Sequence, residues 1–492
     1  MKLLWGDLHN HCGITYGSGS LEHALRLAQA QLDFCSVTPH GFWPDMPARN
    51  EDTAFIIDFH ENGFEKIKNN WSFYTTAMEK ANVPGKFSTF FSFEMHSSMW
   101  GDYTFVSPDR NLRITPENIP GNVIKANETV PMIGIPHHIG YTPGYRGINW
   151  EGFNGRISPV VEVCSKHGCA MHDYSGFPYY HDMGPLDSRN TVFRGLALGK
   201  QFSFVGSTDH HAGCPGSFGD GKTAILAEEN TRDALWEALL KGRVYAVTGN
   251  KIKCDFSVNG YGFGSRIKQN NTAEITYSVQ AGGALDRVII YRNIEPLHLV
   301  DGLTLDPGGG PYKVKLEFGW GGNIEPFRWN IRLNVKEGFI MDVEPCFRGA
   351  NMISPTQKLK NTGSVNDLTF NINEIDKQNV SIVCDTLRNI STLHPNTSAL
   401  IFEIDGGEKT RLYFDINDKK ESIDLSSLLR YGFSGHLKPY SSNAYRVHTA
   451  VPHGRYSCNG SVTLPGNGNC YHMEVIQRDG DRAFVSPVYM NN

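Results

Sequence analysis

The chain has 492 residues, of which 40% are apolar and 20% are charged, and its net charge is −5. This composition is typical of a globular protein with cores large enough to need no covalent cross-links, and the mild charge does not favour nucleic acid as a partner. The sequence has no apolar run of about 18 residues, so we expect no membrane span. Its scattered cysteines and the absence of a signal-peptide pattern predict a cytoplasmic protein with reduced thiols.

The first half of the sequence alternates short apolar segments with helical patterns. Strands are predicted at residues 2–8, 33–38, 87–94, 131–135, 159–164 and 202–207. A helix is predicted over 20–31, where Ser20 can cap the first turn, and another over 231–241, with Thr231 as its cap and Gly242 as its stop. Strands that alternate with helices predict an α/β fold with parallel strands.

After about residue 250 the pattern changes to short alternating segments separated by Gly, Asn, Asp and Pro. Strands are predicted there at residues 273–279, 287–291, 328–334, 399–403 and 410–414. Many short strands with turn residues between them are typical of a β-sandwich. We therefore predict two domains, an α/β domain at 1–252 and a β-rich, sandwich-like domain at 253–492.

Two motifs with metal-ligand residues follow predicted strands of the first half. His9 and His11 come after the strand at 2–8, and Asp209 and His211 come after the strand at 202–207. Residues i and i+2 of an extended chain face the same way, so each pair can reach one cation. A carboxylate beside an imidazole suits zinc, manganese or iron. His210 should point away from the site.

The same residue types recur at the ends of the other predicted strands. They are His40, Glu94, His96, His137, His138, Glu162, His167 and His172. In a parallel barrel these strand ends converge on one face, where active sites lie. We expect two divalent cations there, with three as the alternative, and Glu94 as their bridge. Two cations held close together can turn water into a nucleophile, so no side-chain nucleophile is required.

Roles follow for the remaining candidates. Glu94, Asp209 and His211 are predicted to serve catalysis as cation ligands, whereas Glu162 and His167 are predicted either to contact the substrate or to orient the ligands. Side chains near the predicted mouth are candidates for binding the substrate. They are Arg146 and Lys166 for an anionic group, and Tyr145 for an organic leaving group.

These motifs resemble those of the polymerase and histidinol phosphatase (PHP) superfamily. The matching residues are, in order, His9 with His11, Thr38-Pro39-His40, Glu94, Pro136-His137-His138, and Asp209 with His211. The sequence is also similar, at Trp5-Gly6-Asp7-Leu8-His9 and at Val161 to Gly168, to a PHP-related family of large proteins with poorly assigned function and a β-rich C-terminal region. The resemblance implies a distorted (β/α)7 barrel, similar to a TIM barrel, and a metal-dependent hydrolysis of esters, often phosphate esters.

The sequence departs from the superfamily pattern at two places that bear on the ligand set. Pro39 stands where the superfamily usually has Asp, and Gly101-Asp102 stands where the narrower family tends to have Gly-His. The choice between His96 and Asp102 as a ligand is therefore open. The choice between His137 and His138 is open as well, with His138 favoured.

The leading hypothesis is a metal-dependent hydrolase of a small-molecule phosphate ester or related ester. A second hypothesis is an amidohydrolase-like enzyme that cleaves an amide, a carboxylic ester or a lactone. A third is a non-catalytic protein in which the metal is structural and the β-rich half binds a glycan. Homo-oligomers are compatible with all three.

Overall fold

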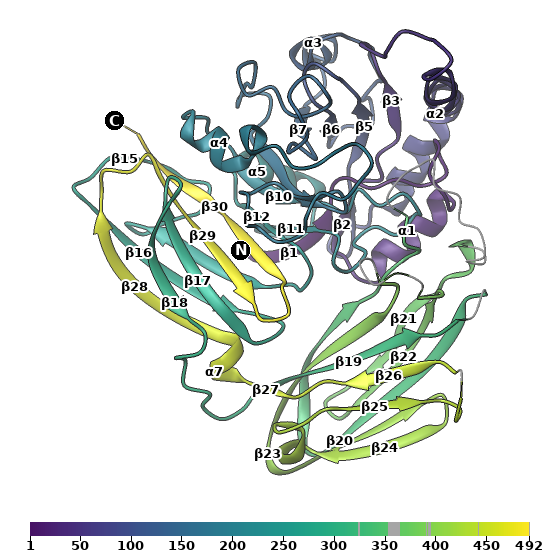
Figure 1. Ribbon diagram of the computed structural model, residues 1–492, viewed down its shortest axis with the longest axis vertical. Coiled ribbons are helices and arrows are strands. Elements are labelled where there is room, and N and C mark those ends of the chain that lie inside the picture. The colour runs from purple at the N-terminus through teal and green to yellow at the C-terminus, as the bar shows by residue number, and fades with distance from the viewer. Residues whose placement is uncertain (323–324, 353–364, 390, 392–394, 441, 492) are drawn as a thin grey trace.

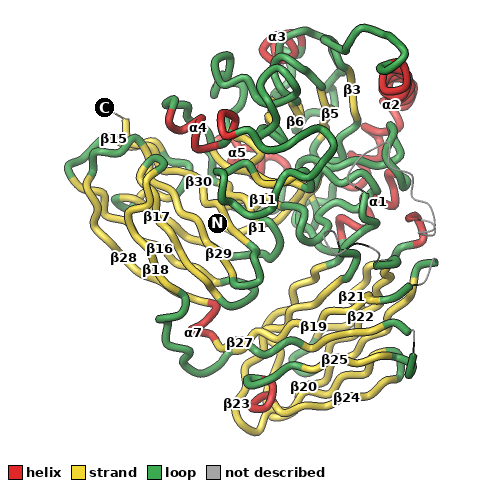
Figure 2. The backbone as a smooth tube through the Cα atoms, in the orientation of Figure 1, coloured by secondary structure: helices red, strands yellow, loops and turns green. Residues whose placement is uncertain are grey.

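The computed structural model describes residues 1–322, 325–352, 365–389, 391, 395–440 and 442–491 and divides into three regions (Figure 1). The α/β region spans residues 1–247. The C-terminal β unit combines residues 253–301 with 453–491, and the inserted β unit, residues 312–452, lies between these two segments in the sequence. Most helix lies in the α/β region, whereas the two β units consist mainly of strands (Figure 2).

The strands of the α/β region are short, and several of them precede a loop that carries a candidate site residue. They are β1 Lys2–Asp7, β2 Phe34–Cys35, β3 His40–Phe42, β4 Ser88–Thr89, β5 Phe91–Met95, β6 Tyr103–Ser107, β7 Ile133–Pro136, β8 Val160–Ser165, β9 Gly168–Cys169, β10 Ser203–Gly206, β11 Lys222–Ala227 and β12 Val244–Val247. Each strand predicted for this half overlaps one or two of them.

Parallel pairs join β1 to β2, β2 to β4, β3 to β5, and β8 to β10. In contrast, β6 runs antiparallel to both β5 and β7. The start of β6 therefore lies beside the ends of its two neighbours, which brings Asp102, the residue before β6, to the same edge as Glu94. A barrel requires one sheet that closes on itself, but hydrogen bonds divide the strands of residues 1–247 among three sheets. The distorted barrel therefore stays a prediction.

The helices of this region are α1 Leu21–Gln29, α2 Ala54–Ala81, α3 Pro120–Ala126, α4 Val192–Ala197 and α5 Arg232–Leu240, with a 3-10 turn at Ser188–Asn190. The predicted caps are confirmed, because the Ser20 side chain accepts a hydrogen bond from His23 N and the Thr231 side chain accepts one from Ala234 N. The 28-residue helix α2 was not predicted.

The C-terminal β unit packs against the α/β region and shares a sheet with it. Its strands are β13 Lys253–Val258, β14 Tyr261–Gly262, β15 Arg266–Lys268, β16 Thr272–Gln280, β17 Leu285–Arg292, β18 Glu295–Asp301, β28 Ser457–Pro465, β29 Cys470–Gln477 and β30 Arg482–Asn491, with the short helix α7 at His453–Tyr456. Because β30 pairs with β12, one sheet spans the predicted boundary at residues 252/253. That boundary stays a prediction.

The inserted β unit is built on one large sheet. Its strands are β19 Tyr312–Trp320, β20 Phe327–Cys346, β21 Phe370–Ile375, β22 Asn379–Thr386, β23 Ser398–Ile416, β24 Lys419–Asp424, β25 Phe433–His436, β26 Ala444–Val447 and β27 Val451–Pro452, with α6 at Leu425–Leu428 and a 3-10 turn at Val365–Asp367. A β-rich second half is thus confirmed, while its sandwich form stays a prediction. The segments predicted as two strands at 399–403 and 410–414 belong to the single strand β23.

The hydrophobic core of the inserted β unit reaches into the α/β region. Leu27 of α1, together with Ala212 and Cys214 from the loop after β10, belongs to the same cluster of buried side chains as Trp329 and Phe402. The loop that carries Asp209 and His211 is therefore supported from below by a separate sheet. All ten cysteines are buried and none forms a disulfide. In the part of the chain that is described, every helix is too short or too polar to cross a membrane.

Asp7, the last residue of β1, ties two candidate ligand motifs together. Its carboxylate accepts hydrogen bonds from Thr208 Oγ1 at 2.6 Å and from Gly216 N at 2.9 Å. It also accepts from the backbone N–H groups of His9 and Thr208. Burial nevertheless raises the pKa of Asp7 to about 6. Buried acceptors of this kind are costly to remove, because the donors around them lose their partners.

We expect Asp7→Ala to lower the free energy of unfolding by about 3 kcal/mol, because it leaves several buried donors unpaired. Urea denaturation followed by circular dichroism measures this loss. Asp7→Asn keeps a side-chain oxygen as acceptor and should cost less than Asp7→Ala. Equal stability of Asp7→Ala and the unmodified chain would contradict the structural role assigned to this carboxylate.

Candidate metal centre

The two ligand motifs at the ends of β1 and β10 are held side by side by backbone hydrogen bonds. Asp209 N donates to His9 O at 2.8 Å, and His11 N donates to His210 O at 2.9 Å. The two segments thereby continue as a ladder beyond their strands. This pairing turns the side chains of His9, His11 and Asp209 toward one point, while His210 points away from it and is buried.

The donor atoms of these three residues have the spacing that a metal ion requires. His11 Nε2 lies 3.0 Å from His9 Nε2 and 3.0 Å from Asp209 Oδ1, and His9 Nε2 lies 3.4 Å from that same oxygen. Ligands bound to a tetrahedral ion at 2.0–2.1 Å are about 3.3 Å apart. The first predicted ligand group is therefore assembled in the fold.

Glu94 lies at the centre of the cluster and faces imidazoles on both sides. Its Oε2 is 3.5 Å from His11 Nε2 and 3.4 Å from His40 Nε2, and its Oε1 is 3.2 Å from His137 Nε2 and 3.1 Å from His96 Nδ1. The side chain is buried, yet Oε2 has no hydrogen-bond partner among the described residues. A buried carboxylate oxygen without a donor is costly, so this atom indicates a cation ligand.

The remaining candidates form overlapping groups around Glu94. Asp102, His137 and His138 form one group with it, and His40 and His96 form another. Both members of each open pair, His96 with Asp102 and His137 with His138, therefore lie in the cluster.

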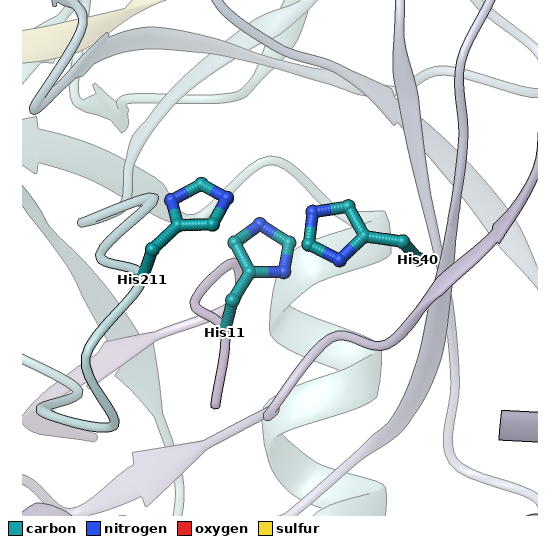
Figure 3. A group of neighbouring side chains, drawn as sticks. All are labelled: His11, His40 and His211. Atoms are coloured by element: carbon teal, nitrogen blue, oxygen red, sulfur yellow. The ribbon is translucent and has the colours of Figure 1, made fainter. Parts of the chain in front are cut away.

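A further group joins residues from three distant parts of the sequence. Figure 3 shows the imidazoles of His11, His40 and His211 facing one another. The ring of His11 lies between the other two, with ring centres 3.9 Å from His40 and 4.3 Å from His211. His11 follows β1, His40 begins β3, and His211 follows β10, so only the tertiary fold brings these rings together.

Two of the candidate ligands have a left-handed backbone. Asp209 has φ 48° and His138 has φ 29°, and such values are uncommon for residues other than glycine. Each costs on the order of 1–3 kcal/mol and persists only where the surroundings enforce it, as they do at functional sites.

The outward nitrogens of the imidazoles are held by hydrogen bonds, as is typical of metal-binding histidines. His11 Nδ1 donates to Thr38 O at 2.7 Å, and His9 Nδ1 lies 3.0 Å from Glu162 Oε2. Glu162 is thus placed as the partner that orients His9. The other such contacts are His40 Nδ1 with Thr15 Oγ1, His167 Nδ1 with Tyr141 OH, and His137 Nδ1 with Thr104 Oγ1. The second nitrogen of His167 lies 3.1 Å from Asp209 Oδ2.

The protonation states of the central groups suit cation binding. Burial alone would raise the pKa of the Glu94 carboxyl, but the His96 and His40 imidazoles hold it well below its usual range. Burial holds the pKa of His40 well below its usual range. An ionised carboxylate and a neutral imidazole are the forms that ligate metal. His9 differs, because the Asp209 carboxylate raises its pKa in spite of burial.

A cavity of 120 Å³ opens onto the cluster and includes residues that the sequence did not indicate. Tyr16, Ile56, His60, His181, Asp182 and Met183 line it beside His40, Glu94, His96, His138, Arg146, His167, Asp209 and His211. Ile56 and His60 come from α2, the helix that the sequence pattern did not reveal. His181 lies in the loop between β9 and the 3-10 turn at Ser188–Asn190, far from any strand end, so the pattern of ligands at strand ends could not indicate it.

The three predicted substrate-binding residues lie in different surroundings. Arg146 lines the cavity, and its guanidinium donates to Asp102. Lys166 pairs with Asp220 at 3.1 Å and lines a separate cavity, and Tyr145 is 57% exposed. His172 lies outside the cluster, where its Nε2 is 3.2 Å from Glu474. The substrate-binding roles of Arg146, Lys166 and Tyr145 stay predictions.

The matching family model and the curated relatives cover part of this chain. The family model described as "Protein of unknown function (DUF3604)" matches residues 217–309. An uncharacterized protein of Chlamydia muridarum is 25% identical over 212 residues, which cover 39% of this chain and 32% of that protein. An uncharacterized protein of Chlamydia trachomatis is 28% identical over 198 residues, covering 37% of this chain and 30% of that protein. The match thus spans about a third of the length of these curated relatives.

Two solved structures are also similar. One is a two-domain protein from Bacteroides vulgatus that contains a predicted PHP-like metal-dependent phosphoesterase; it has a TM-score of 0.31 and 12% identity and covers 86% of this chain and 95% of that chain. The other is a lesion-specific endonuclease from Pyrococcus furiosus, with a TM-score of 0.31 and 9% identity, covering 49% of this chain and 56% of that chain.

Proposed function

We propose that this chain is a metal-dependent hydrolase of a small-molecule phosphate ester. The observation that carries the proposal is the position of Glu94, whose two oxygens each face imidazole nitrogens at 3.1–3.5 Å. A carboxylate with ligand groups on both sides is suited to bridge two cations. His9, His11 and Asp209 would complete the site on one side, and His137, His138 and Asp102 on the other.

Divalent cations at this place, zinc, manganese or iron by the mixture of oxygen and nitrogen donors, would supply a Lewis acid and lower the pKa of water. The chain itself contributes the outer partners. Thr38 O and Glu162 orient His11 and His9, so the ligand nitrogens keep their direction.

The charge of the site favours an anionic substrate over a neutral one. Four carboxylates, those of Glu94, Asp102, Glu162 and Asp209, are buried in or beside the cluster, whereas the described residues that line the cavity include one guanidinium, that of Arg146. Two divalent cations would reverse this excess of negative charge, and a third would make the site strongly positive. A phosphate ester matches such a site better than a neutral amide or lactone does.

The cavity residues define how a phosphate ester would lie. The 120 Å³ cavity has room for a phosphoryl group but little more, so the organic part would extend toward the mouth. Among the described residues, Arg146 Nη1 has the Met183 sulfur as its one hydrogen-bond partner, at 3.5 Å, and it could donate to a phosphate oxygen. His181 Nε2 is buried without a partner among the described residues and is placed to hydrogen-bond an ester oxygen.

We expect the purified chain to contain divalent metal and to hydrolyse an aryl phosphate. A chelator should abolish turnover, and zinc, manganese or iron should restore it, because the ligands lie preassembled. Elemental analysis and a phosphate-release assay measure both quantities, with an aryl carboxylic ester tested in parallel. Turnover of the carboxylic ester alone would favour amidohydrolase-like chemistry, and metal without any turnover would favour a structural role.

Glu94→Gln should lower the number of tightly bound cations and reduce kcat by at least about a hundredfold, because a neutral amide is a poor bridge between cations. Elemental analysis after dialysis and steady-state kinetics test this. Glu128→Gln, at an exposed carboxylate outside the cluster, is the matched control. Unchanged metal stoichiometry in Glu94→Gln would contradict the assignment of Glu94 as a bridging ligand.

Arg146→Gln should lower kcat/KM for an aryl phosphate by about ten- to a hundredfold, the usual worth of a hydrogen bond to a charged group. Arg110→Gln, which removes an exposed guanidinium, controls for the change of net charge. An aryl-phosphate assay compares kcat/KM of the two variants and tests whether Arg146 binds the substrate. If Arg146→Gln matched Arg110→Gln in kcat/KM, the guanidinium would not bind the substrate.

A further inference from the structure

We propose that Tyr16 is a positioning residue that fixes the orientation of His96 at the candidate metal centre, and that the shape of helix α2 accommodates its ring. The inference rests on the proposed function, since it concerns the same cation site.

The Tyr16 side chain makes specific contacts inside the cluster. Its hydroxyl lies 2.9 Å from His96 Nε2, and its ring stacks on the ring of His40 with centres 3.8 Å apart. It also contacts the rings of Phe59 and His60 from α2. The residue lines the cavity that opens onto Glu94. Tyr16 thus touches two candidate ligands, one through its ring and one through its oxygen.

Both ring nitrogens of His96 have partners, on opposite edges of the ring. Arg146 Nη2 lies 2.5 Å from His96 Nδ1, and a guanidinium can only donate hydrogen bonds. The same nitrogen lies 2.9 Å from Asp102 Oδ2 and 3.1 Å from Glu94 Oε1. On the opposite edge of the ring, Nε2 lies within hydrogen-bond distance of the Tyr16 oxygen.

The His96 ring is therefore held between two sets of partners, with Tyr16 at Nε2 and with Arg146 and Asp102 at Nδ1. Loss of the Tyr16 hydroxyl would leave Nε2 without this partner, so the ring could turn and Nδ1 would no longer be held toward Glu94 and Asp102.

Helix α2 leaves space for the Tyr16 ring at one glycine. A Cβ atom on Gly63 would lie 2.2 Å from Tyr16 Cδ1 and 2.9 Å from Tyr16 Cε1. Gly63 is in the interior of α2, where glycine lowers helix stability relative to alanine. Because Gly63 has an ordinary helical backbone, the requirement comes from the ring and not from the local conformation.

Neighbouring turns of α2 hold the same segment. His60, one turn before Gly63, packs against the Tyr16 ring, and Lys66, one turn after it, donates to Gly13 O and to Thr15 O. Residues 60, 63 and 66 lie on one face of the helix by their spacing. This face therefore fixes both the backbone of the loop after His11 and the aromatic ring that the loop carries.

A simpler reading is that Tyr16 only fills space. A phenylalanine would fill the same space and would stack on His40 equally well. The two readings separate at the hydroxyl, because only the positioning role requires its bond to His96. Tyr16→Phe is therefore the decisive variant, and it is nearly isosteric, so the chain should still fold.

The experiment measures binding of zinc and of cobalt to the full chain after removal of metal, by chelator competition and by the visible absorption of bound cobalt. We expect Tyr16→Phe to weaken one cation site ten- to a hundredfold, in about the range for loss of a ligand's outer partner, and to alter the cobalt bands. Thermal unfolding of the metal-free chain should be unchanged. A filling role alone would move neither the affinity nor the spectrum.

Gly63→Ala tests the helix independently, with Gly121→Ala as its matched control. Gly121 is also helical, in α3, and a Cβ there would meet no atom within 4 Å. We expect Gly63→Ala to weaken metal binding at least as much as Tyr16→Phe, and Gly121→Ala to bind metal like the unmodified chain. Wild-type affinity and spectrum in Tyr16→Phe would overturn this inference alone. Failure of the unmodified chain to bind any cation would overturn the proposed function with it.

Discussion

A concentration of buried negative charge and imidazole nitrogen around Glu94 is the constraint on which the rest of this structure depends. Four carboxylates are almost fully buried there, with one guanidinium and no lysine among the cavity residues. Side chains alone cannot satisfy such a group, because oxygens and imidazole nitrogens approach one another at 3.0–3.5 Å without enough protons to share. Cations bound at this place would remove the electrostatic cost of assembling the cluster.

Several interactions outside the cluster hold the ligand-bearing loops in place and offset this electrostatic cost. The backbone ladder between the segments at His9 and Asp209 sets the first ligand group, and the Asp7 carboxylate fastens the base of both loops. The inserted β unit contributes its hydrophobic core beneath the loop after β10. A left-handed backbone at Asp209 and His138 can be maintained because these supports leave the loops few alternatives.

Helix α2 connects the cavity to the loop that follows His11. It contributes His60 to the cavity, accommodates Tyr16 at Gly63, and ties down residues 13–15 through Lys66. The face of α2 that carries the function is therefore polar and contains a glycine. A helix face with these residue types gains less free energy from burial than an aliphatic face does. The position of α2 therefore depends on its contacts with Tyr16 and with the candidate ligands.

The sequence by itself determined the elements that have strong local signals and the residue types of the site. Ser20 and Thr231 predicted the starts of α1 and α5, and the pairs His9 with His11 and Asp209 with His211 predicted a metal centre, because i, i+2 spacing after a strand has a fixed geometric meaning. Helix α2 escaped prediction because its buried face includes His60, Gly63 and Thr75, which do not form an apolar period.

Only the tertiary structure decided how the candidates are combined. It placed both His96 and Asp102 in the cluster, since β6 runs antiparallel and brings its first end to the rim beside the end of β5. It placed Lys166 with Asp220, outside the cavity, and it brought Tyr16 and His181 in from loops that have no periodicity to read. Strand direction and loop packing depend on contacts between residues far apart in the chain, and such contacts leave no local pattern in the sequence.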